Sequence, residues 1–464
     1  MPKLTFLGAA GNVTGSRYLF EDKKTQLLID CGLYQEREFL SRNWDPSPLK
    51  PPEIEAVLLT HAHLDHTGLL PKLVRDGFKG KIYATEATLE LAEVMLLDSA
   101  RIQEEDAATK KRRHKREGRR GPHPEEPLYT VEDAEACFPL FKPTGYDDPI
   151  EFDGIRATLL NAGHVLGSAM IFLEFKSRDG DERSICFSGD IGRPDRPLEE
   201  TPLSPTTPDY LVVESTYGDR DHEPVEEVEE KFARIINETV ERGGNVVIPA
   251  FALERTQELI HYLRLLISQK KIPQLPVFVD SPMAIKLTGI FSQHPELWGG
   301  DIEGFKKGSP FDFPGLKLTS SVDDSKAIAE QKGSSIIIAG SGMVTGGRIK
   351  HHLVQNISRP ESTVLFTGYQ AHGTLGRLIV EGKSPVRILG QHFEVKGDIR
   401  QLQGLSAHAD RTELLEWTSH LAEAPRHVFV THGEESAAGA FVKALQKRTG
   451  WTVTAPGYED SFEL

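Results

Sequence analysis

A repeated pattern constrains the fold of this chain: short apolar, β-branched runs end abruptly in polar residues or glycine. The runs are TQLLIDCG (25–32), AVLLTHAHLDH (56–66), SICFSGD (184–190), YLVVESTYG (210–218) and HVFVTHGE (427–434). Continuous apolar runs of this length are typical of strands that are buried on both faces. Helical patterns lie between several runs, for example over residues 87–105. Alternating strands and helices predict an α/β fold.

The middle third of the chain repeats one unit four times: a strand, a turn of small residues and a helix. The four units cover residues 245–263, 276–291, 335–353 and 363–382. They predict a separate, mainly parallel α/β domain between two segments that both carry histidines suited to metal binding. We therefore expect an inserted domain at 209–390, between a first domain part at 1–208 and its continuation at 391–464. The Pro- and Thr-rich stretch 200–210 would be the entry linker.

A dense cluster of metal-type side chains follows one of the buried strands. Three histidines and an aspartate fall within six residues, as His61, His63, Asp65 and His66. Imidazole and carboxylate groups bind zinc and similar divalent ions. A turn that leaves a strand can aim His61 and His63 at one point while Asp65 and His66 reach a second. The motif itself therefore predicts two metal ions.

Single polar residues at other strand ends are further candidate ligands. His164 lies in NAGHVLGSA, Asp190 ends SICFSGD and His432 ends VFVTHGE. Each alone would usually be structural. Open α/β sheets place their sites at the carboxyl ends of strands, so we interpret the three together with the cluster as ligands.

These motifs resemble known families. HAHLDH, GHVLGS and SGD, in this order, resemble the metallo-β-lactamase superfamily. VESTYG, GSGMVTGGR, GYQAHGTLGR, LSAHAD and VTHGE are similar to the β-CASP nucleases, which include the endonuclease subunit of the pre-mRNA 3′-end cleavage complex and its bacterial and archaeal homologues. The resemblance covers nearly the whole chain. It implies a metallo-β-lactamase αββα sandwich with an inserted parallel α/β β-CASP domain.

The resemblance also assigns ligands by position. His61, His63 and His164 would hold a first zinc ion, and Asp65, His66 and His432 would hold a second. Asp190 would bridge the two, and Asp30 would orient the histidine turn from behind. Glu214, His408 and His432 match the three positions typical of the β-CASP group. Two zinc ions are the expected cofactor, although the ligand types leave manganese open.

The predicted reaction is hydrolysis of a phosphodiester. Two divalent cations can clamp the phosphate and lower the pKa of a bridging water, so that hydroxide forms at neutral pH. We expect this hydroxide to attack phosphorus in line, with Asp65 accepting or orienting its proton. His408 would protonate the leaving oxygen, with Glu214 holding its tautomer. The resemblance implies 5′-phosphate and 3′-hydroxyl products.

RNA is the expected substrate. In the resembling family, members that act on RNA tend to carry histidine at the position of His432. Two glycine-rich turns before predicted helices suggest phosphate binding, although such turns are also ordinary in α/β domains. The candidate RNA-phosphate contacts are Ser341, Arg348, Thr374 and Arg377. Endonucleolytic cleavage is the favoured mode, and a 5′-exonuclease would share the same site.

One segment stands out against the acidic whole. The net charge is −15, which argues against indiscriminate nucleic-acid binding. Residues 110–120, KKRRHKREGRR, nevertheless contain eight Lys or Arg. This segment is either a solvated, mobile loop or a nucleic-acid contact, and the sequence does not decide between them.

Other functions remain as alternatives. A DNA-directed β-CASP nuclease is disfavoured by His432. A thioesterase-like or lactamase-like hydrolase would share the zinc ligands but would need neither the inserted domain nor Glu214 and His408. An inactive structural subunit would have lost ligands that are all present here.

The chain offers few signs of targeting. It has no run of about 18 apolar residues, so no membrane span is expected, and its N-terminus lacks the pattern of a signal peptide. Three cysteines far apart make a disulfide framework improbable and favour the cytoplasm. The sequence is compatible with a homodimer and does not decide the oligomeric state.

Overall fold

The structure is a computed structural model. It describes residues 2–23, 25–46, 48–118, 125–194, 196–204, 207–223, 225–299, 310–368, 370–371 and 373–464. The chain forms two compact units, one of Met1–Asp221 with Ala407–Leu464 and the other of His222–Ser406. The first unit is therefore built from both ends of the chain, and the second is inserted into it.

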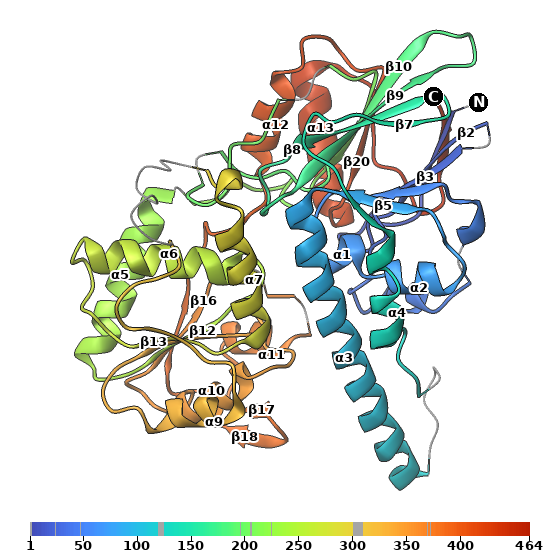
Figure 1. The fold of residues 1–464 in the computed structure, drawn as a ribbon. Helices are drawn as coiled ribbons and strands as arrows, with labels where there is room; N and C mark the ends of the chain where they lie inside the picture. Colours follow the sequence, from blue (N-terminus) through green and yellow to red (C-terminus); the bar gives the residue numbers. More distant parts are fainter. Residues whose placement is uncertain are drawn as a thin grey trace. The chain divides into compact units, whose positions relative to one another are not determined.

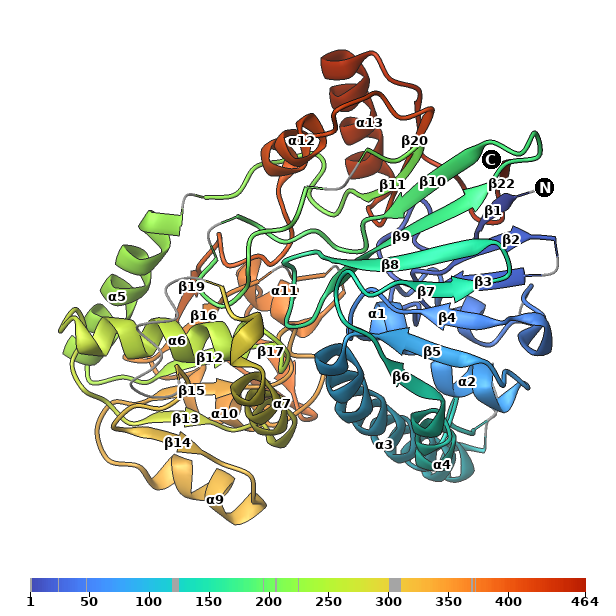
Figure 2. The ribbon, with the colours of Figure 1, turned by 45° about the horizontal axis from the view of Figure 1, so that its top comes forward.

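The first unit contains two seven-stranded sheets (Figures 1 and 2). One has the order β22-β1-β2-β3-β4-β5-β6 and the other the order β21-β20-β11-β10-β9-β8-β7. The first sheet comprises β22 (Ser461–Glu463), β1 (Lys3–Phe6), β2 (Tyr18–Asp22), β3 (Thr25–Ile29), β4 (Ala56–Leu58), β5 (Lys81–Ala84) and β6 (Phe141–Pro143). The second comprises β21 (Val453–Thr454), β20 (His427–Thr431), β11 (Tyr210–Glu214), β10 (Glu182–Phe187), β9 (Ala169–Lys176), β8 (Ile155–Asn161) and β7 (Ile150–Phe152).

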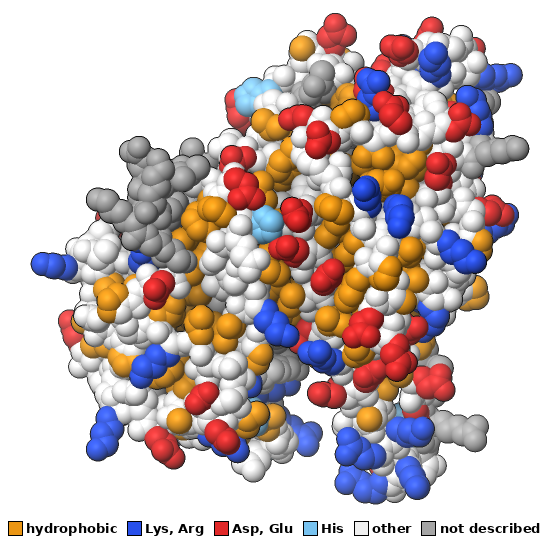
Figure 3. Space-filling view, viewed as in Figure 1, with side chains coloured by type: hydrophobic (Ala, Val, Ile, Leu, Met, Phe, Trp, Pro, Cys, Tyr) orange, Lys and Arg blue, Asp and Glu red, His pale blue; other side chains and the backbone are white. Residues whose placement is uncertain are grey.

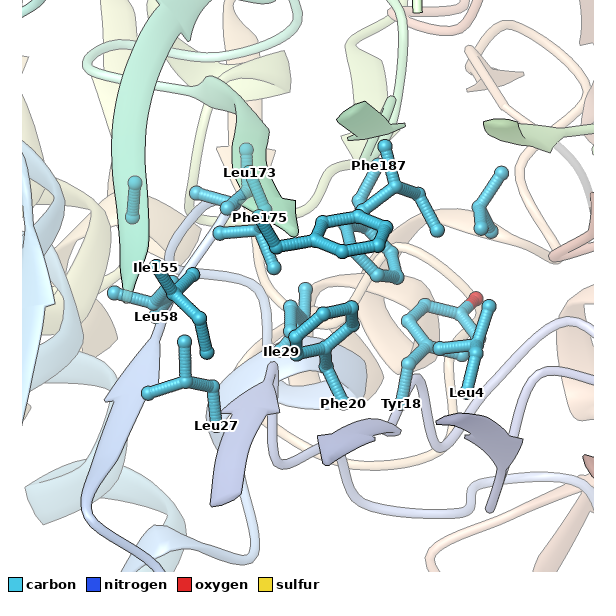
Figure 4. Packing of buried hydrophobic residues seen from close by; sticks show 14 of the residues in the cluster. Leu4, Tyr18, Phe20, Leu27, Ile29, Leu58, Ile155, Leu173, Phe175 and Phe187 are labelled. Atoms are coloured by element: carbon cyan, nitrogen blue, oxygen red, sulfur yellow. The ribbon is translucent and has the colours of Figure 1, made fainter. Parts of the chain in front are cut away.

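The main core lies between these two sheets. Phe20 of one sheet packs on Phe175 of the other with ring centroids 5.0 Å apart, and Tyr18 stacks on Phe187 at 5.9 Å. Figure 4 shows the two layers of side chains meeting face to face. Because several strands are also covered on their outer faces, their apolar runs are continuous instead of alternating.

Helices cover the outer face of each sheet. On the first sheet they are α1 (Leu64–Thr67), α2 (Leu70–Arg75), α3 (Glu86–Glu117) and α4 (Val131–Glu135), packed over Leu28, Val57 and Ile82. On the second sheet α12 (Arg411–Ser419) and α13 (Glu435–Thr449) pack over Leu211 and Val430. The layers are thus helix, sheet, sheet, helix, which confirms the predicted αββα sandwich.

The second unit is built on one parallel six-stranded sheet of order β14-β13-β15-β12-β16-β19. Its strands are β14 (Leu316–Leu318), β13 (Val277–Val279), β15 (Ile336–Ala339), β12 (Val246–Pro249), β16 (Thr363–Phe366) and β19 (Asp398–Gln401). Its helices include α5 (Val225–Glu241), α6 (Arg255–Ser268), α7 (Pro282–Gln293), α9 (Val322–Ala327), α10 (Ile349–Asn356) and α11 (Leu375–Val380), and β17 (Val386–Ile388) and β18 (Gln391–Phe393) form a hairpin. Each of the four predicted units contains one of these strands and the helix that follows it.

The limits of the inserted unit differ from the predicted 209 and 390. Strand β11 pairs with β10 and β20 of the first unit, so the chain leaves that unit only after Asp221. Strand β19 pairs with β16, which keeps the chain in the second unit until Ser406. Each of the two strands is paired into the sheet of its own unit, and strand pairing therefore sets the limits.

Two further features follow from the helices and cysteines. Helix α3 runs to Glu117 and ends at Gly118 in the left-handed conformation, so residues 110–117 are helical and do not form a loop. Residues 119–120 of the basic segment lie outside the described part of the chain. Cys31, Cys137 and Cys186 are buried free thiols. Within the described ranges, no helix is both long enough and apolar enough to cross a membrane.

Candidate metal centre

The histidine turn follows strand β4 directly. His61 and His63 lie in the connection after β4, and Asp65 and His66 lie in the first turn of α1. His61 is fully buried, and its Nε2 lies 3.0 Å from Nδ1 of His63. The end of a central strand thus carries four polar side chains that a buried sheet would otherwise exclude.

Asp30 holds this turn from behind. It follows β3 and is fully buried. Its carboxylate accepts hydrogen bonds from the backbone N–H and the hydroxyl of Thr60, both at 2.8 Å. It also accepts one from Nδ1 of His66 at 2.7 Å. With Nδ1 held by Asp30, Nε2 is the ring nitrogen of His66 that faces the cluster, which is the orientation that metal-binding histidines require.

Asp190 lies at the centre of the site, directly after β10. Its Oδ2 is 3.4 Å from His61 Nε2 and 3.5 Å from His164 Nε2. Its Oδ1 is 3.4 Å from His66 Nε2 and 3.5 Å from His432 Nε2. Each carboxylate oxygen therefore faces a different pair of imidazoles.

All seven ligands suggested by the sequence come together in the first unit. The first group is His61, His63, His164 and Asp190, and the second is Asp65, His66 and His432. Within each group the possible ligand atoms lie within 4.8 Å of one another. In the second group, His432 Nε2 is 3.0 Å from His66 Nε2 and 3.6 Å from Asp65 Oδ2.

The donor atoms fit metal ions better than they fit one another. Both ring nitrogens of His164 and Oδ1 of Asp190 are buried and make no hydrogen bond. A buried polar atom without a partner costs about 1–3 kcal/mol, and buried polar groups are rarely left unpaired. Imidazole and carboxylate donors of this kind are the usual ligands of zinc and related divalent ions. The residues of this cluster therefore fit divalent metal ions.

At His61 and His164 the electrostatics favour ligation. Burial, together with neighbouring imidazoles, lowers the pKa of His61 and of His164 well below the ordinary value, so both rings are neutral. At His66 and His432 burial lowers the pKa, but the charge of Asp190 and of the neighbouring carboxylates raises it above the ordinary value, so a metal bound there would displace a proton. Burial would raise the pKa of Asp65, but its hydrogen bond with His432 and the charge of His66 lower it to about 2. Asp190 is also buried, yet the surrounding imidazoles hold its pKa well below the usual range. Neutral imidazoles and ionised carboxylates are the forms that bind metals.

Glu214 and His408 form a third group beside Asp190. Glu214 ends strand β11, and its Oε1 accepts a hydrogen bond from the backbone N–H of Ile191 at 2.7 Å. His408 Nδ1 lies 3.1 Å from Oε1 of Glu214 and 3.8 Å from Oδ2 of Asp190. Burial lowers the pKa of His408, but the charges of Glu214 and Asp190 outweigh this and raise it to about 10. The ring of His408 is thus oriented by Glu214, and the two carboxylates favour its protonated form.

Two hydroxyl groups that the sequence did not single out complete the site. Thr60 Oγ1 lies 3.0 Å from Nδ1 of His61, and Thr216 Oγ1 lies 3.0 Å from Nδ1 of His432. Each hydroxyl donates its own proton elsewhere, to Asp30 and to the carbonyl of His432. Each therefore accepts from Nδ1, so that Nε2 would be the nitrogen that binds a metal. Their positions directly before His61 and within VESTYG were the available signal.

The four predicted phosphate contacts lie in the second unit and have local partners there. Ser341 Oγ accepts from the backbone N–H groups of Thr345 and Gly346, at 3.0 and 3.2 Å. Thr374 caps α11, and Arg377 Nε donates to Glu381 at 2.6 Å.

Arg348 is also engaged inside the second unit. Its Nη1 donates to the buried carboxylate of Asp280 at 2.6 Å, and its Nη2 donates to the carbonyl of Ser320 at 2.7 Å. His352 donates to the same carboxylate from Nε2 at 2.7 Å. These contacts account for Arg348 structurally, because they join the ends of two strands and a helix.

Comparison with known proteins follows the same division of the chain. Three family models match: a metallo-β-lactamase superfamily domain over residues 19–179, a Beta-Casp domain over 256–379 and a Zn-dependent metallo-hydrolase RNA specificity domain over 393–456. The chain is 36% identical over 443 residues to ribonuclease TTHA0252 of Thermus thermophilus, with 95% of both chains covered. The chain belongs to the β-CASP group of the metallo-β-lactamase superfamily. As a member of this family of nucleases it is a metal-dependent hydrolase.

More distant relatives share this architecture. The chain is 31% identical to transcription termination factor FttA of Methanocaldococcus jannaschii and 30% identical to that of Methanosarcina mazei. In both cases the match covers 96% of this chain and 69% of the relative. A crystal structure of a protein of unknown function from Enterococcus faecalis V583 matches with a TM-score of 0.58 at 12% identity, over 100% of both chains. At this identity, the likeness supports the fold and says nothing about function.

Proposed function

We propose that this β-CASP protein is a two-zinc ribonuclease that cuts RNA at internal phosphodiester bonds. The observation that carries the proposal is the position of Asp190. Oδ2 of its carboxylate faces the first group of ligands, and Oδ1 faces the second. The His408–Glu214 pair lies beside the same carboxylate. Two zinc ions held there would clamp a phosphate and lower the pKa of a bound water. Manganese is the alternative metal.

The chain's own residues would supply the proton transfers. Asp65 is ionised, so its carboxylate can accept or orient the proton of the attacking water. His408 is protonated and can give its proton to the leaving oxygen. Glu214 holds Nδ1 of His408, which directs Nε2 of the ring away from Glu214. Acid and base are thus separate groups: His408 lies beside Asp190, and Asp65 lies beside His432.

RNA is the proposed substrate for two reasons. The relative that matches over 95% of both chains is named a ribonuclease, and the model over residues 393–456 is named for RNA specificity. His432 also matches the position at which the resembling RNA-directed members tend to carry histidine. A role in transcription termination is not proposed, because the match covers only 69% of the two FttA proteins.

Phosphate binding by the second unit is part of the proposal. Ser341 and Thr374 lie in glycine-rich turns before helices, where backbone amides can bind phosphate oxygens. Arg377 is exposed enough to exchange Glu381 for a phosphate. Arg348 would contribute chiefly by shaping its turn through Asp280.

The test is cleavage of labelled RNA by purified protein loaded with zinc or with manganese. One circular RNA, one linear RNA labelled at both ends, and matched DNA are each incubated with and without chelator. We expect the circle to be opened, products with 5′-phosphate ends, and no cleavage with chelator or with the Asp65→Ala variant. Intact RNA after incubation with the zinc-loaded protein would refute the proposed activity. An uncut circle together with shortened linear RNA would mean that the protein is an exonuclease.

A further inference from the structure

The end of helix α3 carries a dense group of exposed cations that the metal centre does not use. The helix packs on its sheet through apolar residues up to Ala107, after which His114 is its sole buried residue. Residues 108–117 therefore extend about 15 Å beyond the packed part, at 1.5 Å per residue. His114 Nδ1 donates to Glu125 at 2.7 Å, which ties the returning chain to this extension.

This extension carries cations around nearly its whole circumference. Lys110, Lys111, Arg112, Arg113, Lys115 and Arg116 are all exposed, and we call these six residues the basic arm. At 100° per residue they leave only the direction of His114 uncharged. Figure 3 shows Lys and Arg side chains gathered at this end of α3. The ion pair found at this end of the helix is that of His114 with Glu125.

Local structure accounts for only part of this charge. Cations near a helix C-terminus interact favourably with the helix dipole, but this effect falls off within the last turn. Lys110 and Lys111 lie more than one turn before Glu117. Like charges at i and i+4, such as Lys111 and Lys115, destabilise the helix by a few tenths of a kcal/mol. The basic arm is therefore kept at a cost to the helix, in a chain of net charge −15.

Helix α3 runs from the loop that carries His164 to the basic arm. At its other end, the hydroxyl groups of Thr85 and Thr88 donate to the carbonyl of Gly167, at 2.7 and 2.8 Å. Gly167 lies in the loop that carries His164. Between Thr88 and the basic arm the helix rises about 33–42 Å. A stacked nucleic-acid strand, at about 3.4 Å per nucleotide, needs roughly ten nucleotides to span this distance.

We propose that the basic arm is a second RNA-binding site, which holds the phosphates of an RNA about ten or more nucleotides from the bond that is cut. The proposal rests on the ribonuclease function above and adds a dependence on RNA length. Lysine and arginine in this density match a polyanion, and each phosphate contact releases counterions. The arm would bind the RNA backbone without reading its sequence, because phosphates carry none.

The composition of the basic arm argues against other partners. A helix that lies on a membrane surface needs an apolar face, and residues 108–117 contain no apolar side chain larger than alanine. Stable protein interfaces are rich in aromatic residues at their centre and poor in lysine. The acidic surface of a second copy of this chain is the remaining rival, and the test below includes it.

The test compares two triple variants of the intact zinc-loaded protein. The arm variant is Lys111→Gln, Arg112→Gln and Lys115→Gln, which keeps good helix formers. The control variant is Lys142→Gln, Lys176→Gln and Arg178→Gln, which removes the same charges from exposed positions elsewhere in the unit. RNAs of 8 and 40 nucleotides with the same cleavage site are used. Binding is followed by fluorescence anisotropy from 50 to 500 mM salt, and kcat and KM are measured separately.

We expect the arm variant to bind the 40-mer at least about tenfold more weakly, with a salt slope lower by about 2, or 0.7 for each lost contact. The affinity of the arm variant for the 8-mer and its kcat should equal those of the wild type. The control variant should equal the wild type in every measurement. Equal effects of the two variants on the 40-mer would overturn the proposal. So would a dimer, seen by light scattering in the wild type, that only the arm variant dissociates. A 40-mer that is bound through the arm but left uncut would refute the ribonuclease function and leave the arm site standing.

Discussion

At the scale of single residues, the site is ordered by the atoms that hold the far side of each imidazole. Asp30 holds His66, Thr60 holds His61 and Thr216 holds His432, in each case through Nδ1. Such partners fix the tautomer and the direction of the ring, and losing one typically costs 10–100-fold in metal affinity or activity. The hydroxyl groups therefore belong to the site as much as the ligands do.

Thr216 offers a test of this ordering. Thr216→Val keeps the shape of the side chain but removes the acceptor for His432 Nδ1. We expect zinc affinity to fall about 10–100-fold, measured by competition with a chromogenic chelator. Thr216→Ser restores the hydroxyl and should recover most of the affinity. Equal affinities for the valine and serine variants would mean that the hydroxyl does not position His432.

His408 separates proton transfer from metal binding. In His408→Ala the proton donor to the leaving oxygen is gone, and we expect kcat on RNA to fall by about 10²–10⁴. The seven assigned ligands are untouched, so zinc content by plasma mass spectrometry should stay at two ions per chain. Loss of one zinc ion from this variant would instead make His408 a ligand, since its Nδ1 also lies near Asp190.

The sequence located the cluster of metal-type side chains but not the contacts of Arg348, for a physical reason. His164, Asp190 and His432 each end an apolar run, and strand ends meet at one edge of a sheet, so local pattern was enough to group them. Arg348 also follows a strand and a glycine turn, but its partner Asp280 is 68 residues away in the sequence. Only the folded second unit shows that this guanidinium is already bound.

At the scale of elements, close backbone contacts hold the histidine turn against strand β3. A Cβ added to Gly32 would lie 1.6 Å from the carbonyl oxygen of Asp65 and 2.7 Å from the backbone nitrogen of Ser16. The first turn of α1 therefore sits on a position that only glycine allows. This close contact fixes the positions of Asp65 and His66.

Gly32→Ala should accordingly damage stability and metal binding together. We expect the free energy of unfolding to fall by at least about 1–3 kcal/mol, as for other overpacked sites, with a loss of bound zinc, because α1 must shift. Gly439→Ala in α13 is the control: its added Cβ meets nothing within 4 Å, and alanine should stabilise that helix by up to about 1 kcal/mol. Denaturant unfolding and zinc analysis of both variants decide the point, and unchanged zinc in Gly32→Ala would contradict it.

Element types were easier to predict than element ends. Apolar runs predicted the central strands, because burial on both faces leaves a strong pattern. The basic segment was ambiguous, since mutual repulsion favours a loop while Lys and Arg are good helix formers. The helix extends through it and stops at Gly118 in the left-handed conformation, a common helix terminator. That outcome depends on the packing of residues 86–107, which the charged segment itself does not reveal.

At the scale of the whole molecule, the metal centre is a property of one unit. Its ligands follow β4, β10 and β20, start α1, and lie in the β8–β9 loop. They connect the two sheets of the first unit at the ends of their central strands. The second unit contributes none of the seven ligands and has its own core around Val247, Ile337 and Val364. The division between the units, after Asp221 and before Ala407, depends on strand pairing, so the sequence located it only approximately.

Removal of metal should therefore loosen the two units unequally. A ligand present at 1,000 times its dissociation constant stabilises the folded state by about 4 kcal/mol. Chelation should remove this stabilisation from the first unit and leave the stability of the second unit unchanged. We expect hydrogen exchange to accelerate in β3, β4, β10 and β20 after chelation and to stay unchanged in β12, β15 and β16. Restoring zinc should restore protection, because the metal would give partners to buried ligand atoms that otherwise make no hydrogen bond. Equal acceleration in both units would mean that they unfold as one, and no acceleration in either would mean that the cluster holds no metal worth a few kcal/mol.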